Sequence, residues 1–276
     1  MLARQCPGLL GVMTVLVWTV PATAAAPEPS GNQHFLGIAY ATEDGRELYR
    51  EEHWVSRKQG REARLVQYQC PDGSPFARKW VRGATDDPAP DFDLYDHRDQ
   101  YREGVRRADA QRTGAAREVY VQKSGTQRPQ SVPVPAQPGL VIDAGFDAYV
   151  RTHWAALLAS QEPVVPFLVP SRLAVYDLKL SGAESRPATA ADDGPVYRFR
   201  LKLDAWYGFA TPAVLMTYTA SDRRLRRFEG VSNIRSANGG SLNVRIEFPP
   251  SERYAAPSQE DINAAAAQPL VPRCAG

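Results

Sequence analysis

Apolar and polar residues alternate along most of this chain with the two-residue period of β-strands. In residues 242–248, for example, Leu242, Val244 and Ile246 alternate with Asn243 and Arg245. Similar alternation occurs in residues 35–40, 66–70, 76–82, 174–180 and 197–203. One apolar and one polar side per strand is typical of an antiparallel sheet with a single covered face.

One segment has a helical period instead. Its apolar residues recur at the spacing of one helix face, and they are Phe146, Tyr149, Val150, Trp154, Leu157 and Leu158. Asp143 is expected to cap the first turn, because its side chain can accept a hydrogen bond from a free backbone N–H. Pro163 is expected to end the helical stretch.

The other side of this helix carries the small residues Ala148, Thr152, Ala155 and Ala159, so contacts on both sides are expected. Counting 100° per residue places His153 near the middle of the apolar face. Two interpretations of His153 stay open. It is a core histidine bonded to a backbone carbonyl, or it is catalytic or touches a ligand.

Turn residues separate the predicted strands. Glycine after acidic residues at 43–45 and the Pro-Asp-Gly of 71–73 predict two hairpins. Residues 101–104, which end in Gly104, predict another turn.

Prolines concentrate in residues 128–139, where they disfavour both helix and ladder bonds. This segment is an interdomain linker or a crossover inside one domain, and we favour the crossover. After residue 251 the tail is expected to be loose apart from a short helix capped by Ser258. The fold class predicted is α+β, mainly antiparallel β, as a curved sheet or open half-barrel with one central amphipathic helix.

The first residues have the layout of an export signal. Arg4 precedes an apolar run at 9–20, and small residues follow at 22–26. We therefore expect a signal peptide at 1–26 and a single β-rich domain at 27–276. The apolar run is shorter than the roughly 20 residues of a spanning helix, so the predicted mature protein is periplasmic and not transmembrane.

Two cysteines remain after this segment, Cys70 and Cys274. In an oxidising compartment they form a disulfide, or Cys70 is a buried thiol and Cys274 a free one on the tail.

The net charge of the chain does not indicate a class of binding partner. The formal net charge is +2 with 23% charged residues, so nucleic acid is not an expected partner. Arg198, Arg200 and Lys202 form a basic row on one strand face. This row is an anion-binding patch for an envelope component, or an ordinary solvated face.

Motifs of catalysis are missing from the sequence. It contains no G-x-S-x-G elbow, no H-E-x-x-H and no phosphate-cradling glycine loop. We therefore expect neither an enzyme nor a cofactor, and no metal site.

The stretch YTASDRRLRRFEGVSNI at 218–234, together with the export signal and the helix between strands, resembles uncharacterised exported proteins of Gram-negative bacteria. The arrangement is also similar to the half-barrel of outer-membrane lipoprotein carriers. That resemblance implies an unclosed barrel around a helix, with an apolar cavity for an acyl chain.

Two functions follow as hypotheses. The first is a non-catalytic periplasmic protein that binds an apolar or lipid-like ligand in the concave sheet face. Its expected wall residues are Trp154, Leu157, Phe167 and Tyr176, with His153 beside them. The second is an envelope assembly or scaffold protein that binds a partner through the basic row. A cavity beneath the helix favours the first, and a filled core favours the second.

Overall fold

The structure of this protein is a computed structural model. It describes residues 31–108, 117–123, 128–186, 194–205, 213–236 and 238–275. The expected signal peptide, residues 1–26, lies outside the described residues.

Strands dominate the described residues. The first half of the sheet consists of β1 (Gln33–Ala41), β2 (Glu47–Lys58), β3 (Arg61–Gln69), β4 (Pro75–Ala84), β5 (Asp91–Asp96), β6 (Tyr101–Arg107), β7 (Arg117–Gln122) and β8 (Gln130–Val134). The second half consists of β9 (Val141–Ile142), β10 (Val164–Val169), β11 (Ala174–Arg186), β12 (Val196–Leu203), β13 (Val214–Thr219), β14 (Leu225–Arg235) and β15 (Ser241–Glu247). A further short strand is β16 (Arg253–Tyr254).

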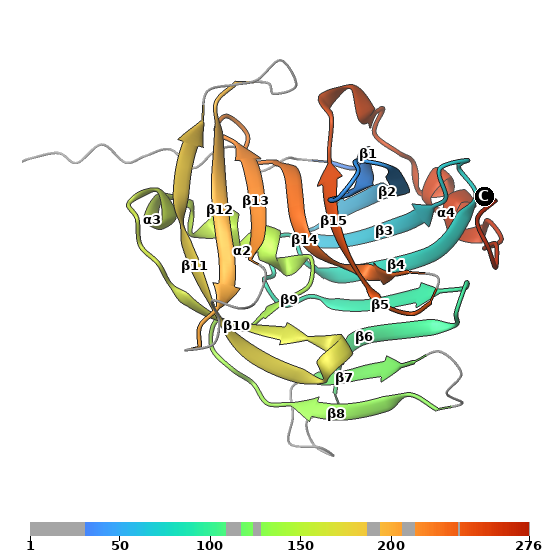
Figure 1. Cartoon of the computed structure of the whole chain (residues 1–276), viewed down its shortest axis with the longest axis horizontal. Coiled ribbons are helices and arrows are strands. Elements are labelled where there is room, and N and C mark those ends of the chain that lie inside the picture. The colour runs from blue at the N-terminus through green and yellow to red at the C-terminus, as the bar shows by residue number, and fades with distance from the viewer. Residues whose placement is uncertain are drawn as a thin grey trace, which may run out of the picture.

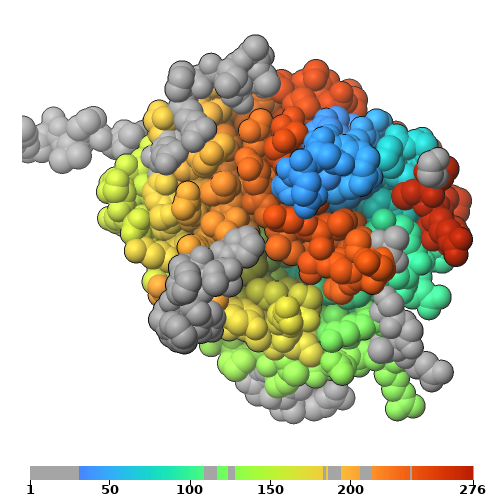
Figure 2. Space-filling view, in the orientation of Figure 1, coloured from blue at the N-terminus to red at the C-terminus, as the bar shows by residue number. Residues whose placement is uncertain are grey.

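These strands form one open sheet (Figure 1). Its order is β8-β7-β6-β5-β4-β3-β2-β1-β15-β14-β13-β12-β11-β10-β9, and β16 pairs with β1. Neighbours are antiparallel except for β9 and β10. The pairing of β1 with β15 joins the halves, and Figure 2 shows the blue N-terminal part of the sheet beside orange-red atoms of the C-terminal third. The predicted fold class is confirmed.

Two predicted hairpin turns are confirmed. Gly45 has φ 73° and Gly73 has φ 89°, in the left-handed region that glycine adopts without a Cβ clash. In contrast, the predicted turn at 101–104 is wrong, because these residues lie in β6. Gly104 is needed there for another reason. A Cβ would meet the Phe92 carbonyl oxygen of β5 and the Tyr120 side chain of β7.

The inner faces of the two halves contact each other. Tyr49 and Ser232 share a hydrogen bond of 2.6 Å between their hydroxyl oxygens, although 183 residues separate them. One apolar cluster combines Val66, Phe76 and Val105 of the first half with Ile234 and Val244 of the second. The inner face of the sheet is therefore buried against itself.

The predicted helix is present but is broken at His153. Its parts are α2 (Gly145–Thr152) and α3 (Trp154–Leu158). The prediction that Asp143 is the N-cap is wrong, because Ala144 occupies that position and no side chain caps the turn. Asp143 has φ 45°, a left-handed conformation that Asp tolerates better than most residues, and its carboxylate points elsewhere.

Helix α2 lies between the halves (Figure 1). Its bulky side packs with Leu180 and Phe199 of the second half. On its other side, Gly145 meets Pro88 and Pro90 in the connection from β4 to β5. Of the predicted small-residue face only Ala148 is buried, while Thr152, Ala155 and Ala159 are exposed. The helix therefore braces the sheet mainly through its first two turns.

Gly145→Ala is expected to lower the free energy of unfolding by about 1–3 kcal/mol, the usual effect of overpacking. A Cβ at this position would lie 2.6 Å from Pro90 Cδ and still closer to the Pro88 carbonyl. Gly182→Ala is the control, because the nearest atoms to its Cβ would be 3.7 Å away. Urea unfolding of both variants checks the prediction, and equal stabilities would contradict it.

The tail after residue 251 folds against the first half. Helix α4 (Gln259–Ala267) begins at Ser258, whose side chain accepts a hydrogen bond from the Asp261 backbone N–H, as predicted. The Cys70–Cys274 disulfide is also present. No helix in the described part of the chain has the length and apolar character needed to span a membrane.

Candidate functional site

Most of the expected ligand-wall residues lie in a packed aromatic cluster. The Trp154 ring makes edge contacts with Tyr197, Phe199 and Tyr218, at centroid distances of 5.6, 5.4 and 6.1 Å. Leu157 is fully buried. The space around Trp154 and Leu157 is therefore filled by side chains of the protein.

Phe167 lies at the border of this cluster, 6.4 Å from the Phe146 ring. Tyr176 is its cross-strand partner on β11 and is half-buried. The structure therefore brings Trp154, Leu157 and Phe167 together and places Tyr176 beside them. Their role in binding stays a prediction.

The placement of His153 in the middle of the apolar face is wrong. The helix breaks at this residue, which leaves its side chain exposed. Its Nδ1 donates to the Tyr149 carbonyl at 2.9 Å, and the two rings stack at 4.1 Å. The expected hydrogen bond to a backbone carbonyl is present, but on the surface rather than in the core.

A buried polar network lies where the inner faces meet. Lys79 Nζ contacts both carboxylate oxygens of Asp143, at 3.0 and 3.2 Å. The Asn233 amide donates to Asp143 at 3.1 Å and to Glu103 at 2.8 Å. Tyr101 donates its hydroxyl proton to Glu103 at 2.6 Å. The network joins β4, β6, β14 and the start of α2, so it fixes the relative position of the two halves.

The charges in this network are unequal, with two carboxylates facing one ammonium group. Burial raises the pKa of the Glu103 carboxyl, while the hydrogen bonds from Tyr101 and Asn233 lower it. The charge of Asp143 raises that pKa further, and Lys79 opposes this effect. The net direction is upward, so ionised Glu103 costs stability in the folded state.

The stability of the wild type relative to Glu103→Gln is expected to fall as the pH rises. Because the folded-state pKa is raised, the contribution of Glu103 is present below its unfolded pKa and is lost as the pH rises through the folded pKa. Urea unfolding of both proteins between about pH 4 and pH 8 tests this. Burial lowers the pKa of His53, which gives the opposite pH dependence. Both proteins contain His53, so its contribution cancels in the difference between their stabilities. A difference that grows with pH would contradict the prediction.

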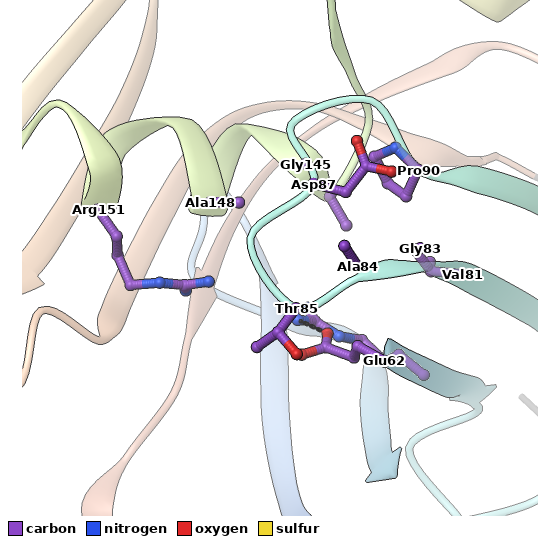
Figure 3. Close-up of a pocket in the computed structure, with 12 residues that line it drawn as sticks. Glu62, Val81, Gly83, Ala84, Thr85, Asp87, Pro90, Gly145, Ala148 and Arg151 are labelled. Atoms are coloured by element: carbon purple, nitrogen blue, oxygen red, sulfur yellow. Dashed lines mark hydrogen bonds and ion pairs between the residues drawn. The ribbon is translucent and has the colours of Figure 1, made fainter. Parts of the chain in front are cut away.

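A small polar pocket of about 20 Å³ lies between α2 and the first half (Figure 3). Ala148 and Arg151 line it from α2, and Thr85 and Asp87 line it from the connection between β4 and β5. Its volume suits one water molecule and is too small for an organic ligand.

Beside this pocket, Glu62 lies between two arginines. Its carboxylate binds Arg57 at 2.7 Å and Arg64 at 2.8 Å. Burial acts to raise the pKa of Glu62, but these two guanidinium groups outweigh it and hold the pKa below its ordinary value. The charges around the small pocket are therefore satisfied by ion pairs within the protein.

A larger, half-open pocket of about 260 Å³ lies near the two ends of the sheet. Pro88 and Ala89 line it on one side, and the connection from β8 to β9 lines it on the other with Val134, Ala136 and Leu140. Neither this pocket nor the small one is lined by Trp154, Leu157, Phe167 or Tyr176. The sequence did not point to it, because its walls come from segments that are distant along the chain.

Arg117 is the cation in the wall of the larger pocket. Its guanidinium donates to the Ala89 carbonyl and approaches Asp91 only to 4.0 Å. Its Nε is a buried donor without a hydrogen-bond partner among the described atoms. A guanidinium carries five N–H donors, and the wall of this pocket also contains the acid Asp87 and the amide Gln137.

The predicted basic row lies on the outer face, where acidic residues interrupt it. Arg198 lies 3.8 Å from Glu229, and Arg227 pairs with Glu247 at 3.2 Å. Among the described side chains no ion pair is seen for Arg200 or Lys202. The three predicted residues share β12, and within the described part of the chain Arg200 and Lys202 have no ion-pair partner.

In the described ranges, His, Cys, Asp and Glu side chains form no cluster of three or more that could hold a metal ion.

Comparison of the sequence with protein-family models and with curated proteins finds no match. Among solved structures, the chain is similar to a β-barrel-like protein of the domain of unknown function DUF1849 from Brucella abortus. The identity is 9% and the TM-score 0.44, over 79% of this chain and 94% of the other. The similarity is limited to a broad resemblance of fold to a bacterial protein of unknown function.

The buried network does not follow from the sequence pattern, although one residue of the pattern points to it. Lys79 lies between Ala77 and Val81 in the phase of β4 that faces the core. A lysine in the inward phase of an alternating strand needs a buried partner. The expected turn at 101–104 concealed Glu103, which is one of the carboxylates of the network.

Proposed function

We propose that this protein is a non-catalytic periplasmic protein that binds a small amphiphile in the larger pocket. The pocket itself carries the proposal, because its wall is mainly apolar and its polar residues are Arg117, Asp87 and Gln137. Ligand sites often lie at the mouths of barrel-like sheets and combine apolar walls with a few polar groups. The expected export signal and the disulfide support the periplasm.

The size of the pocket limits the ligand. Its volume of about 260 Å³ is below the ~300–1,000 Å³ of most small-molecule sites. A medium-chain carboxylate such as octanoate fits this description better than a two-chain phospholipid. Its carboxylate would pair with Arg117, and its chain would lie against Pro88, Val134 and Leu140.

Calorimetric titration with octanoate tests the proposal. Arg117→Gln is expected to weaken binding about 10- to 100-fold, the equivalent of one charge-assisted hydrogen bond. Ala136→Trp fills the pocket and is expected to abolish binding. Arg106→Gln is the matched control, because Arg106 lies on neighbouring β6, is exposed and pairs with Glu118. The proposal fails if the wild type does not bind octanoate, or if Arg117→Gln binds as the wild type does.

A second candidate function uses the outer face. Arg200 and Lys202 are the two members of the basic row without an ion pair among the described side chains, which favours contact with an anionic envelope component. Arg200→Glu with Lys202→Glu is expected to abolish sedimentation with phosphatidylglycerol vesicles. Unchanged co-sedimentation, or none by the wild type, would exclude this candidate.

A further inference from the structure

The C-terminal strap, residues 255–275, crosses the outer side of β2, β3 and β4. Its helix α4 buries Ile262 and Ala265 against Trp54 and Leu65, with Trp80 at the edge of the cluster. Figures 1 and 2 show this red segment against the cyan strands. The strap therefore covers an apolar patch on a face that would otherwise meet solvent. We call Trp54, Leu65 and Trp80 the covered face.

Besides Ile262 and Ala265, the strap residues Ala266 and Val271 pack against apolar residues of the sheet. Its hydrogen bonds to β3 and β4 use its backbone: Gln67 donates to the Ala265 carbonyl at 3.2 Å, and Arg78 donates to the Gln268 carbonyl at 2.7 Å. The Val271 N–H donates to the Pro75 carbonyl at 2.7 Å. Helix α4 has 9 residues, fewer than the ~12–15 that an isolated helix needs in water.

The disulfide is a covalent attachment of the strap. It fastens the distal end to the turn between β3 and β4, across a sequence separation of 204 residues. Cys70 is fully buried, whereas Cys274 is partly exposed. A thiolate from solvent would therefore approach the bond from the Cys274 side.

We propose that the strap is a redox-controlled cover, which the disulfide holds closed and whose reduction bares the covered face. The reductant is a dithiol, and its thiolate attacks Sγ of Cys274. The S–S bond breaks, a mixed disulfide forms, and the Cys70 thiolate leaves and takes up a proton. The second thiol of the reductant then displaces Cys274. Two electrons and two protons pass to the protein, and the reductant becomes a disulfide.

This inference does not depend on the larger pocket or its ligand. In the reduced protein, the strap loses its link to Cys70, and α4 is too short to persist undocked. When the strap is released, α4 unfolds and Trp54 and Trp80 become exposed. The first event changes hydrogen exchange, and the second changes tryptophan emission.

Hydrogen exchange of the oxidised full-length protein and of the same protein in dithiothreitol tests the proposal. Amides 259–267 are expected to exchange at least about 100-fold faster after reduction, the low end of the gain from an intramolecular link. Amides of β5 to β7 are expected to keep their rates. Tryptophan emission shifts to the red, and the double variant Trp54→Phe, Trp80→Phe lacks this shift. Unchanged protection of α4, or an equal increase throughout the sheet, would overturn the proposal.

Two variants separate the cover from a general loss of stability. Cys274→Ser is expected to show the exchange of the reduced protein without dithiothreitol. Ile262→Asp opens α4 while the disulfide stays intact, and so produces the emission shift in the oxidised state. Asn263→Asp, at an exposed position of the same helix, is the control for Ile262→Asp. A closed strap in Cys274→Ser would also overturn the proposal.

Discussion

Lys79→Met is expected to lower the free energy of unfolding by about 3–5 kcal/mol, the usual loss when one partner of a buried ion pair is removed. The side chains of Lys79 and Asp143 are only 10% and 5% exposed. Methionine keeps the length of the lysine stem but leaves the Asp143 carboxylate buried without its cation. Because the network joins four segments, the loss should appear in the global unfolding transition.

Lys179→Met is the matched control. Lys179 also pairs with an acid, Glu162, at 2.6 Å, but these side chains are 46% and 44% exposed. Pairs of this kind contribute about 0–1 kcal/mol. Urea unfolding of the two methionine variants should therefore separate them clearly, and similar midpoints would show that the buried pair contributes no more than a surface pair.

The double variant Lys79→Met, Asp143→Asn is expected to recover part of this loss, because it removes the unpaired charge. Asparagine also suits the left-handed backbone at position 143. If the double variant is no more stable than Lys79→Met, the uncompensated charge is not the cause of the loss.

Leu157→Ala is expected to lower the free energy of unfolding by about 2–5 kcal/mol, because it leaves a cavity in a filled core. Leu157 is 0% exposed, and its neighbours include Val150, Trp154 and Leu180. Leu158→Ala is the control, since that side chain is 39% exposed and lies one residue further on. Surface changes of this kind usually remain within about 0.5 kcal/mol.

These two leucines also test the function expected from the sequence. If Trp154 and Leu157 lined an apolar ligand site, removing Leu157 would change ligand binding more than stability. The packed contacts around Trp154 favour the opposite result. Thermal unfolding of ligand-free Leu157→Ala distinguishes the two cases. An unfolding midpoint equal to that of the wild type would support a ligand site beside Trp154 and Leu157.

The proposed ligand pocket and the proposed cover lie on different parts of the protein. The larger pocket and Arg117 lie near the ends of the sheet, and the strap covers the outer face of β2 to β4. Because these sites share no residue, ligand binding and strap release can be measured independently. A variant that abolishes octanoate binding is expected to leave the exchange of α4 unchanged.

Local pattern was sufficient for the strands and for several turns. Alternation in residues 242–248 predicts β15, and the turn residues at 43–45 and 71–73 predict two hairpins that the structure contains. Ser258 as a helix cap also follows from residue type, and the Cys70–Cys274 bridge is the one of two open alternatives that the structure contains. In each case the cause lies within a few residues or in the chemistry of one pair.

Local pattern failed where a distant segment decides the conformation. Asp143 looked like a helix cap, but Lys79 and Asn233 draw its carboxylate into the interior. His153 fits the apolar face of an ideal helix, yet the break between α2 and α3 turns it outward. Gly104 looked like a turn residue, whereas it gives room for the neighbouring strands within β6.

By itself, then, the sequence determined that this protein is mainly antiparallel β with one helical stretch between strands, because two-residue and 3.6-residue periods act over short distances. Only the tertiary structure decided that α2 braces two halves of one open sheet. It also decided that Lys79, Glu103 and Asn233 meet, and that the larger pocket lies at the ends of the sheet. The physical reason is that strand order and buried polar pairs depend on contacts between segments far apart in the chain, which no local period records.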